Sequence, residues 1–233
     1  MTEKSQQVCV YLFDAADSRT LQEKLKIAVD GYCYESGIRN RVYKGHAPDV
    51  VFRVERTVSG KPFFPECPQI HFSISHSGAY WACAIAGAPI GLDLQQHVQL
   101  QKETAEEVAV RYRRMAHRFF HPAEAEYVCM SEKTEPEELQ ESYRRFFTVW
   151  AAREAYVKYT GQGIDKDFSE HCVIPAETVK QPCLSAEGVK QYDKAPWVAW
   201  QAQGQHFQGR VLGEGYTMCL CMQNAMQIRL LKK

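Results

Sequence analysis

The sequence predicts an α+β protein that is built from two similar halves. Short apolar runs typical of strands alternate with strongly helical stretches along the chain. A Gly-Ala-Tyr pattern at 78–80 precedes one apolar run, and Glu-Gly-Tyr at 214–216 precedes another. The length of 233 residues fits one large domain or two small ones. We therefore expect an N-terminal half, 1–97, and a C-terminal half, 98–233, joined near residues 95–102.

The first half opens with a strand and a helix. Val8 to Phe13 is apolar throughout and predicts the strand. Asp17 or Ser18 can cap the helix that follows. Its apolar face consists of Leu21, Leu25, Ala28 and Val29.

Four further strands are predicted before residue 97. Val50 to Val58 is the first, closed by a turn at Ser59 to Pro62, and His71 to Ser75 is the second. Tyr80 to Ala86 and Ile90 to Leu94 flank Gly-Ala-Pro at 87–89, which predicts a hairpin.

The second half begins with helices. Lys102 to Phe120 is charged and helical, and Pro122 suits the first turn of another helix. The acidic stretch Ser131 to Glu141 predicts a surface loop. Tyr143 to Thr160 predicts an amphipathic helix that ends at Gly161, and short strands follow.

Composition and charge exclude several classes of protein. Lys plus Arg and Asp plus Glu both number 28, so the basic excess typical of nucleic-acid binders is missing. The apolar stretch from Ala79 to Leu92 has 14 residues, which is too short to span a bilayer. The first seven residues are polar and do not resemble a signal peptide. We expect a cytoplasmic monomer that binds neither nucleic acid nor membrane.

The nine cysteines indicate buried, reduced thiols. Their number is odd, they form no CxxC pair, and most lie in apolar runs. A zinc site would need Cys or His ligands clustered at short spacing, and the sequence has no such cluster.

Three segments carry residues suited to chemistry. The first runs from Gly60 to Phe63 and resumes from Phe72 to Ser77, the second runs from Ile90 to Gln95, and the third from Phe147 to Lys158. Asp93 lies between two leucines at the end of an apolar strand, where a carboxylate is poorly solvated and favours a cation.

The third segment places an acid and a base on one helical face. Trp150, Glu154 and Lys158 are spaced i, i+4 and i+8. Carboxylate oxygens are ligands that Mg²⁺ prefers, and Lys158, Lys61 and His76 are donors for phosphate oxygens. Together these residues indicate a magnesium diphosphate site. Taken singly, each has an ordinary alternative, such as a solvated Glu–Lys pair or a loop histidine.

The three segments, in this order, resemble the signature of the phosphopantetheinyl transferases of the Sfp type. The resemblance runs from Gly60 to about Gly163. It includes Arg-Phe-Phe at 118–120, which is followed by Glu124. It implies a pseudo-dimer of two similar α/β halves that meet at the site.

The resemblance implies a function for each site residue. The enzyme would move the 4′-phosphopantetheine of coenzyme A to a serine of an apo acyl or peptidyl carrier protein and release adenosine 3′,5′-bisphosphate. Asp93, Gln95 and Glu154 are the implied metal positions for Mg²⁺. Glu124 or Glu154 would deprotonate the serine, directly or through water, and Lys158 is the third implied catalytic residue. The implied contacts to coenzyme A are Lys61, Ser75, His76 and Lys158.

The chain also departs from that pattern. Gln95 stands where many relatives have a second acid, and Arg153 replaces the usual lysine before Glu154. In the N-terminal half, Arg39, Arg41 and Lys44 are candidates for the 3′-phosphate. Gln95 keeps open a second interpretation, a non-catalytic coenzyme A or carrier-protein binding module on the same fold. A nucleoside-triphosphate enzyme is not indicated, because the chain has no GxxxxGK[ST] sequence.

Overall fold

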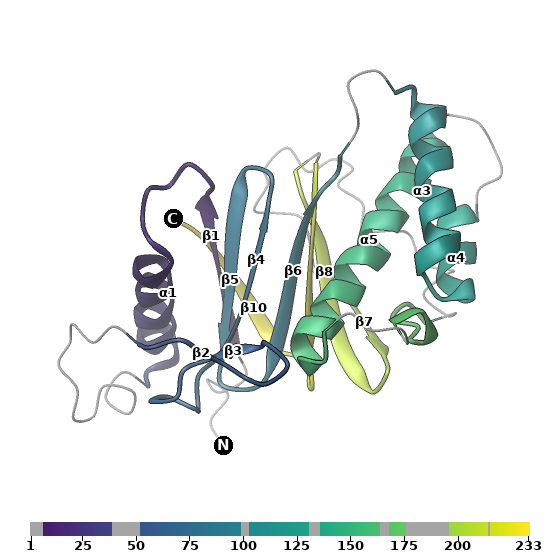
Figure 1. The fold of residues 1–233 in the computed structure, drawn as a ribbon. Coiled ribbons are helices and arrows are strands. Elements are labelled where there is room, and N and C mark those ends of the chain that lie inside the picture. Colours follow the sequence, from purple (N-terminus) through teal and green to yellow (C-terminus); the bar gives the residue numbers. More distant parts are fainter. Residues whose placement is uncertain are drawn as a thin grey trace.

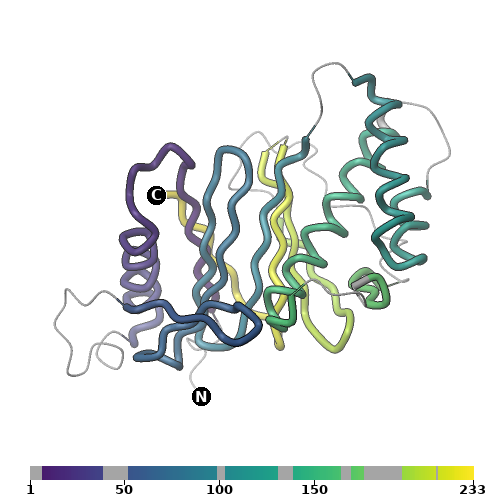
Figure 2. Tube along the Cα trace, in the orientation of Figure 1, coloured from purple at the N-terminus to yellow at the C-terminus, as the bar shows by residue number. Residues whose placement is uncertain are grey.

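The structure is a computed structural model, and its strands form two four-stranded sheets that lie side by side (Figure 1). The residues that it describes are 7–38, 52–98, 103–130, 136–163, 168–175, 196–213 and 215–233. The helices flank the sheets on both outer sides, as the trace in Figure 2 also shows.

The first sheet has the strand order β10-β1-β5-β4. Its members are β1 (Gln7–Asp14), β4 (His71–Ser77), β5 (Tyr80–Ala86) and β10 (Gln227–Lys232). β1 and β4 both pair antiparallel with β5, and β10 runs parallel to β1 at the outer edge. The first sheet therefore contains a strand from the very end of the described chain.

The second sheet has the strand order β6-β9-β8-β7. Its members are β6 (Ile90–Gln96), β7 (Val198–Ala202), β8 (Gln205–Leu212) and β9 (Tyr216–Met222). All neighbours pair antiparallel. A small separate hairpin is formed by β2 (Glu55–Arg56) and β3 (Pro62–Phe63), so the strand expected from Val50 to Val58 is short within the described residues.

The hairpin predicted around residues 87–89 is wrong, although both of its strands exist. β5 pairs with β1 on one side and β4 on the other, so it has no free edge for β6. β6 instead pairs with β9 in the second sheet. The boundary expected at 97/98 consequently differs from the division between the sheets, since β6 precedes that boundary and β10 returns across it.

The helices begin at residues that satisfy their free backbone amides. Thr20, rather than Asp17 or Ser18, caps α1 (Leu21–Ser36), because its hydroxyl accepts from the Glu23 amide and Glu23 bonds back. Thr104 caps α3 (Ala105–Phe119) in the same way.

The last long helix begins earlier than predicted. α4 (Pro122–Cys129) has Pro122 in its first turn, as predicted. α5 (Pro136–Thr160) contains the predicted helix, but it already includes part of the acidic stretch expected as a loop. The short 3₁₀ helix η2 (Phe168–Glu170) follows it.

Three apolar cores hold the layers together. The inner faces of the two sheets meet in one core, with Val10 and Ala84 on one side and Leu92 and Leu220 on the other. α1 covers the outer face of the first sheet. α5 covers the outer face of the second sheet, and α3 and α4 pack against α5 (Figure 1). The order of layers is therefore helix, sheet, sheet, helices.

The two halves repeat one topology, as the short sequence echo predicted. In each half a strand precedes a helix and then two antiparallel strands: β1, α1, β4, β5 in the first and β6, α5, β8, β9 in the second. The two echo tyrosines meet, with the ring centroids of Tyr80 and Tyr216 5.1 Å apart. The predicted α+β fold of two similar halves is confirmed.

Most described cysteines are buried, as predicted. Cys9, Cys33, Cys67, Cys83, Cys219 and Cys221 are buried free thiols. Among the described helices, none is both long and apolar enough to cross a bilayer.

Candidate active site

Asp93 is a buried carboxylate at the centre of the candidate site. Leu92 and Leu94 on either side of it point into the core between the sheets, so Asp93 faces α5. Its side chain is 2% exposed. Its Oδ1 accepts from Ser75 Oγ at 2.9 Å and from Lys158 Nζ at 2.6 Å, and its Oδ2 accepts from Gln95 Nε2 at 2.7 Å.

α5 approaches β6 closely enough to place its side chains beside Asp93. A Cβ on Gly91 would lie 1.9 Å from the carbonyl oxygen of Ala155 and 2.5 Å from the backbone nitrogen of Tyr159. Only glycine permits this distance between the two backbones. As a result Glu154 and Lys158 stand opposite the outward face of β6.

A cavity of about 480 Å³ opens at this junction. Its walls come from β4, β5, β6 and α5. The lining residues are Ile74, Ser75, His76, Trp81, Asp93, Gln95, Trp150, Glu154 and Lys158. The three helical residues Trp150, Glu154 and Lys158 thus share one face, as their spacing predicted.

A second cavity of about 260 Å³ adjoins the first and shares Ile74 and Lys158 with it. Lys61 lines this second cavity, and its Nζ donates to the carbonyl oxygen of Tyr159. Burial lowers the pKa of Lys61. Arg56 and Lys61 line the smaller cavity, His76 lines the larger one, and Lys158 stands at their border.

The electrostatics of the larger cavity are those of two close acids beside one cation. Burial raises the pKa of Glu154, the nearby Asp93 carboxylate raises it further, and Lys158 opposes both effects. Two carboxylates that share a partly dry site attract a cation more strongly than one.

The donor set fits a divalent cation that keeps part of its coordination for other ligands. Asp93 and Glu154 provide carboxylate oxygens, and Gln95 provides an amide oxygen once its side chain rotates. Within the described residues, no group of three or more His, Cys, Asp or Glu side chains is arranged to hold a metal. A hard cation with few protein ligands, such as Mg²⁺ together with phosphate oxygens, matches this set.

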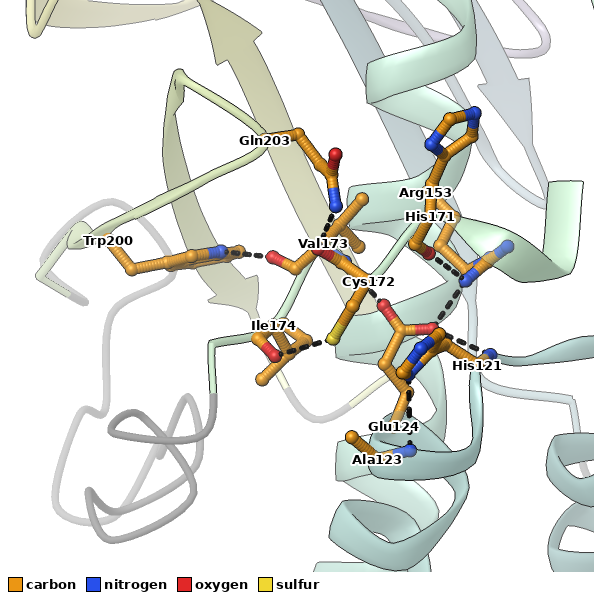
Figure 3. A network of polar contacts seen from close by, with 10 residues as sticks. All are labelled: His121, Ala123, Glu124, Arg153, His171, Cys172, Val173, Ile174, Trp200 and Gln203. Atoms are coloured by element: carbon orange, nitrogen blue, oxygen red, sulfur yellow. Dashed lines mark hydrogen bonds and ion pairs between the residues drawn. The ribbon is translucent and has the colours of Figure 1, made fainter.

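Glu124 lies in a separate polar network, in which it and Arg153 are fully buried (Figure 3). It forms an ion pair with Arg153 on α5, and its Oε1 accepts from the Val173 amide at 2.6 Å. Arg153 also donates to the carbonyl oxygen of His171 at 2.7 Å. Glu124 lines neither cavity of the site. The network joins α4, α5 and the segment before β7, and Trp200 extends it by donating to Val173.

The structure therefore brings six of the predicted residues into one cavity: Ser75, His76, Asp93, Gln95, Glu154 and Lys158. Lys61 lies in the adjoining cavity, and Glu124 stands apart. Arg39, Arg41 and Lys44, the candidates for a 3′-phosphate, lie outside the described residues. Sequence reasoning missed Trp81. Trp81 is the cross-strand partner of His76 in the β4–β5 hairpin, so the register of that hairpin would have predicted it.

Comparison with known proteins identifies the family. A model of the 4′-phosphopantetheinyl transferase superfamily matches residues 89–221. The 4′-phosphopantetheinyl transferase psf-1 of Bacillus pumilus is 29% identical over 163 residues, which cover 67% of this chain and 62% of that protein. The 4′-phosphopantetheinyl transferase Sfp of Bacillus subtilis is 30% identical over 125 residues, which cover 54% of this chain and 47% of that protein.

A third relative has a comparable similarity. The 4′-phosphopantetheinyl transferase gsp of Aneurinibacillus migulanus is 31% identical over 143 residues, 58% of this chain and 51% of that protein. In each of the three cases, the match spans less than two thirds of the relative's own length. The family match contains Asp93, Gln95, Glu154 and Lys158, and from it we conclude that this chain belongs to the 4′-phosphopantetheinyl transferase superfamily.

Proposed function

We propose that this protein transfers the 4′-phosphopantetheine group of coenzyme A to a serine of an apo carrier protein and releases adenosine 3′,5′-bisphosphate. The observation that carries the proposal is the buried Asp93. It pairs with Lys158 and lines a 480 Å³ cavity together with Glu154. Membership of the superfamily and the names of the relatives support the reaction class. We also propose that the protein acts as a monomer.

Cationic and polar side chains at the two cavities suit the diphosphate of coenzyme A. Lys158 stands at their border, Lys61 lies in the smaller cavity, and the exposed His76 lies on the wall of the larger one. Charge-assisted hydrogen bonds from these groups would orient the diphosphate. Holding the phosphorus in line with the incoming hydroxyl is the main catalytic task in phosphoryl transfer.

The carboxylates Asp93 and Glu154, with Gln95 beside them, would hold Mg²⁺. When bound, this ion would neutralise part of the negative charge on the diphosphate. In its absence, Lys158 offsets the charge of the Asp93 carboxylate, and the Gln95 amide donates a hydrogen bond to it. The protein side chains therefore keep the acid in place before the substrates arrive.

Glu154 suits the proton transfer better than Glu124. Glu154 lines the cavity, where its carboxylate would be within reach of the serine hydroxyl. The serine Oγ would form a bond to the β-phosphorus while its proton passes to Glu154, directly or through water. The bond from that phosphorus to the bridging oxygen breaks, and the electron pair leaves with adenosine 3′,5′-bisphosphate. Glu124 bonds to Arg153 and Val173 and lines neither cavity, so the proposal assigns the proton transfer to Glu154.

A second candidate function is a non-catalytic module that binds coenzyme A or a carrier protein. The observation that favours it is Gln95, which gives the site one acid fewer than many relatives of the Sfp type have at this position. In this case coenzyme A would bind, but no group would be transferred.

Mass spectrometry of the carrier protein separates the two functions. An apo acyl carrier protein and an apo peptidyl carrier protein would each be incubated with enzyme, coenzyme A and Mg²⁺. We expect the mass of at least one carrier to rise by one phosphopantetheine, and we expect no gain with Asp93→Asn. That variant keeps the shape of the side chain but removes its charge, and loss of such a group typically costs about 10²–10³ in rate. Coenzyme A binding without any gain in mass would favour the non-catalytic module.

A further inference from the structure

Three serines on β4 join the first sheet to the second. Ser73, Ser75 and Ser77 alternate along β4, so their side chains share its inner face. Their hydroxyls accept from the backbone amides of Leu92, Leu94 and Gln96 on β6, at 2.9, 3.2 and 2.8 Å. We call this set of contacts the serine seam.

The seam takes the place of backbone pairing between the two sheets. β4 is the last strand of the first sheet and β6 is the first strand of the second. The opposite edge of β6 is occupied by β9, so the amides that face β4 need other acceptors. Leu92 and Leu94 are fully buried, which means that water cannot replace the serine oxygens at low cost.

Ser75 differs from the other two seam residues because it also touches the active site. Its Oγ donates to Asp93 Oδ1 at 2.9 Å while it accepts from the Leu94 amide. Ser75 is buried, and its single hydroxyl proton is committed to the carboxylate. The hydroxyl therefore has no proton left to donate to a phosphate oxygen.

We infer that Ser75 is a positioning residue, which orients the Asp93 carboxylate toward the metal and diphosphate rather than binding coenzyme A itself. The inference rests on the proposed function. Because Ser75 belongs to the first sheet and Asp93 to the second, the contact ties the orientation of the carboxylate to the correct approach of the two halves. This differs from the direct contact with coenzyme A that the family resemblance implies for Ser75.

Ser77 provides the matched control for a test, because it lines neither cavity. Ser77→Ala and Ser75→Ala each remove one seam hydrogen bond to a β6 amide, but only Ser75→Ala also removes the contact with Asp93. Coenzyme A affinity would be measured by calorimetry in metal-free buffer. Mn²⁺, as the probe ion, would then be titrated into each variant saturated with coenzyme A.

We expect Ser75→Ala to weaken Mn²⁺ binding and to lower kcat by about 10-fold or more, as is typical for loss of a group that orients a metal ligand. Its metal-free affinity for coenzyme A should stay within about twofold of the parent, since hydrogen bonds to charged ligands usually contribute much more. Ser77→Ala should leave both affinities unchanged. Ser75→Thr keeps the hydroxyl and should recover Mn²⁺ binding.

Two results would overturn the inference. One is a loss of metal-free coenzyme A affinity in Ser75→Ala with Mn²⁺ binding intact, which would make Ser75 a direct ligand. The other is identical behaviour of Ser75→Ala and Ser77→Ala, which would show that Ser75 acts only through its hydrogen bond in the seam. If Ser75→Ala does not fold, the same measurements would be made on Ser75→Cys. This variant retains nearly the same side-chain volume but has a weaker hydrogen-bond donor.

A measurement without ligand separates this inference from the proposed function. The melting temperatures of Ser75→Ala, Asp93→Asn and the double variant would be compared with the parent. We expect the loss in the double variant to be smaller than the sum of the single losses, because the contact can be lost only once. If the losses in melting temperature are additive, the contact between Ser75 and Asp93 is refuted, even if transfer is observed. Coupled losses without any transfer or coenzyme A binding would refute the proposed function alone.

Discussion

At the scale of single residues, the site is a balance of charges around Asp93. The carboxylate is buried and satisfied by three donors, of which Lys158 is the only full charge among them. A cation that binds Asp93 must share it with Lys158 or displace it. Since a phosphate oxygen is a good partner for the freed lysine, diphosphate and metal should bind best together.

Lys158→Ala tests the link between this lysine and the substrate. If Lys158 holds a diphosphate oxygen, coenzyme A affinity should fall by about 10-fold or more, the usual effect of losing a hydrogen bond between charged groups. Titration calorimetry measures the affinity. The matched control is Lys26→Ala, which removes a lysine from an i,i+4 pair on α1. Equal affinity for coenzyme A in Lys158→Ala and the parent would show that Lys158 pairs with Asp93 but does not bind the diphosphate.

Gln95→Glu tests the metal position. Asp93 and Gln95 face the same way on β6, and the Gln95 amide donates to Asp93. An acid at position 95 loses this bond and repels Asp93, so the metal-free variant should melt at a lower temperature than the parent. Half-maximal activity should need less Mg²⁺, with the rate at saturating metal within about tenfold of the parent.

Gln95→Ala is the control for that prediction, since it removes the amide without adding charge. Magnesium titrations of the three forms would be run at saturating coenzyme A and carrier protein. A requirement for Mg²⁺ in Gln95→Glu that equals or exceeds the parent's would show that position 95 does not reach the metal.

At the scale of secondary structure elements, the site is the junction of β6 and α5. β6 carries Asp93 and Gln95, α5 carries Glu154 and Lys158, and the approach at Gly91 sets the gap between them. The ion pair of Arg153 with Glu124 anchors the same helix from its other side. Rotation or displacement of α5 would therefore separate the two carboxylates.

Gly91→Ala should disrupt this junction. The new Cβ would overlap backbone atoms of α5, which cannot move as a side chain can, and such overpacking typically costs about 1–3 kcal/mol of stability. We expect a lower melting temperature together with loss of transfer activity. Gly215→Ala is the control, because a Cβ there meets no atom within 4 Å. Full activity in Gly91→Ala would contradict the tight junction.

At the scale of the whole molecule, a chain with no net charge must attract an acidic partner through a local patch. Carrier proteins of the kind implied by the family resemblance are commonly acidic around their serine. The candidate patch comprises Arg111, Arg113, Arg114, Arg118, Arg144 and Arg145. Of these, Arg114 and Arg118 are exposed on α3, whereas Arg111 and Arg145 already pair with glutamates.

The KM for the carrier protein should therefore rise with ionic strength, because exposed charges are screened over about 8–10 Å. Replacing Arg114 and Arg118 together with Gln should raise the KM at low salt and flatten its salt dependence. The control is Arg229→Gln, because Arg229 lies on β10 in the first sheet. A KM in the parent protein that does not change with salt would argue against electrostatic attraction of the carrier.

Local patterns in the sequence were enough to predict the faces of single strands and helices. The spacing of Trp150, Glu154 and Lys158 defined one helical face, and the place of Asp93 between two leucines required it to point away from the core. The echo of 78–80 at 214–216 predicted the repeated topology. Each of these inferences needs only the periodicity of a helix or a strand, which neighbouring residues impose on one another.

Which strands and helices pack against one another could be learned only from the three-dimensional fold. Periodicity does not reveal that β1 and β4 occupy both edges of β5, and so it predicted a hairpin that β6 does not form. It also could not show that Glu124 is bound by Arg153 or that Ser75 reaches Asp93 across two sheets. Such contacts depend on the close packing of segments far apart in the chain, where burial and free hydrogen-bonding edges select the partner.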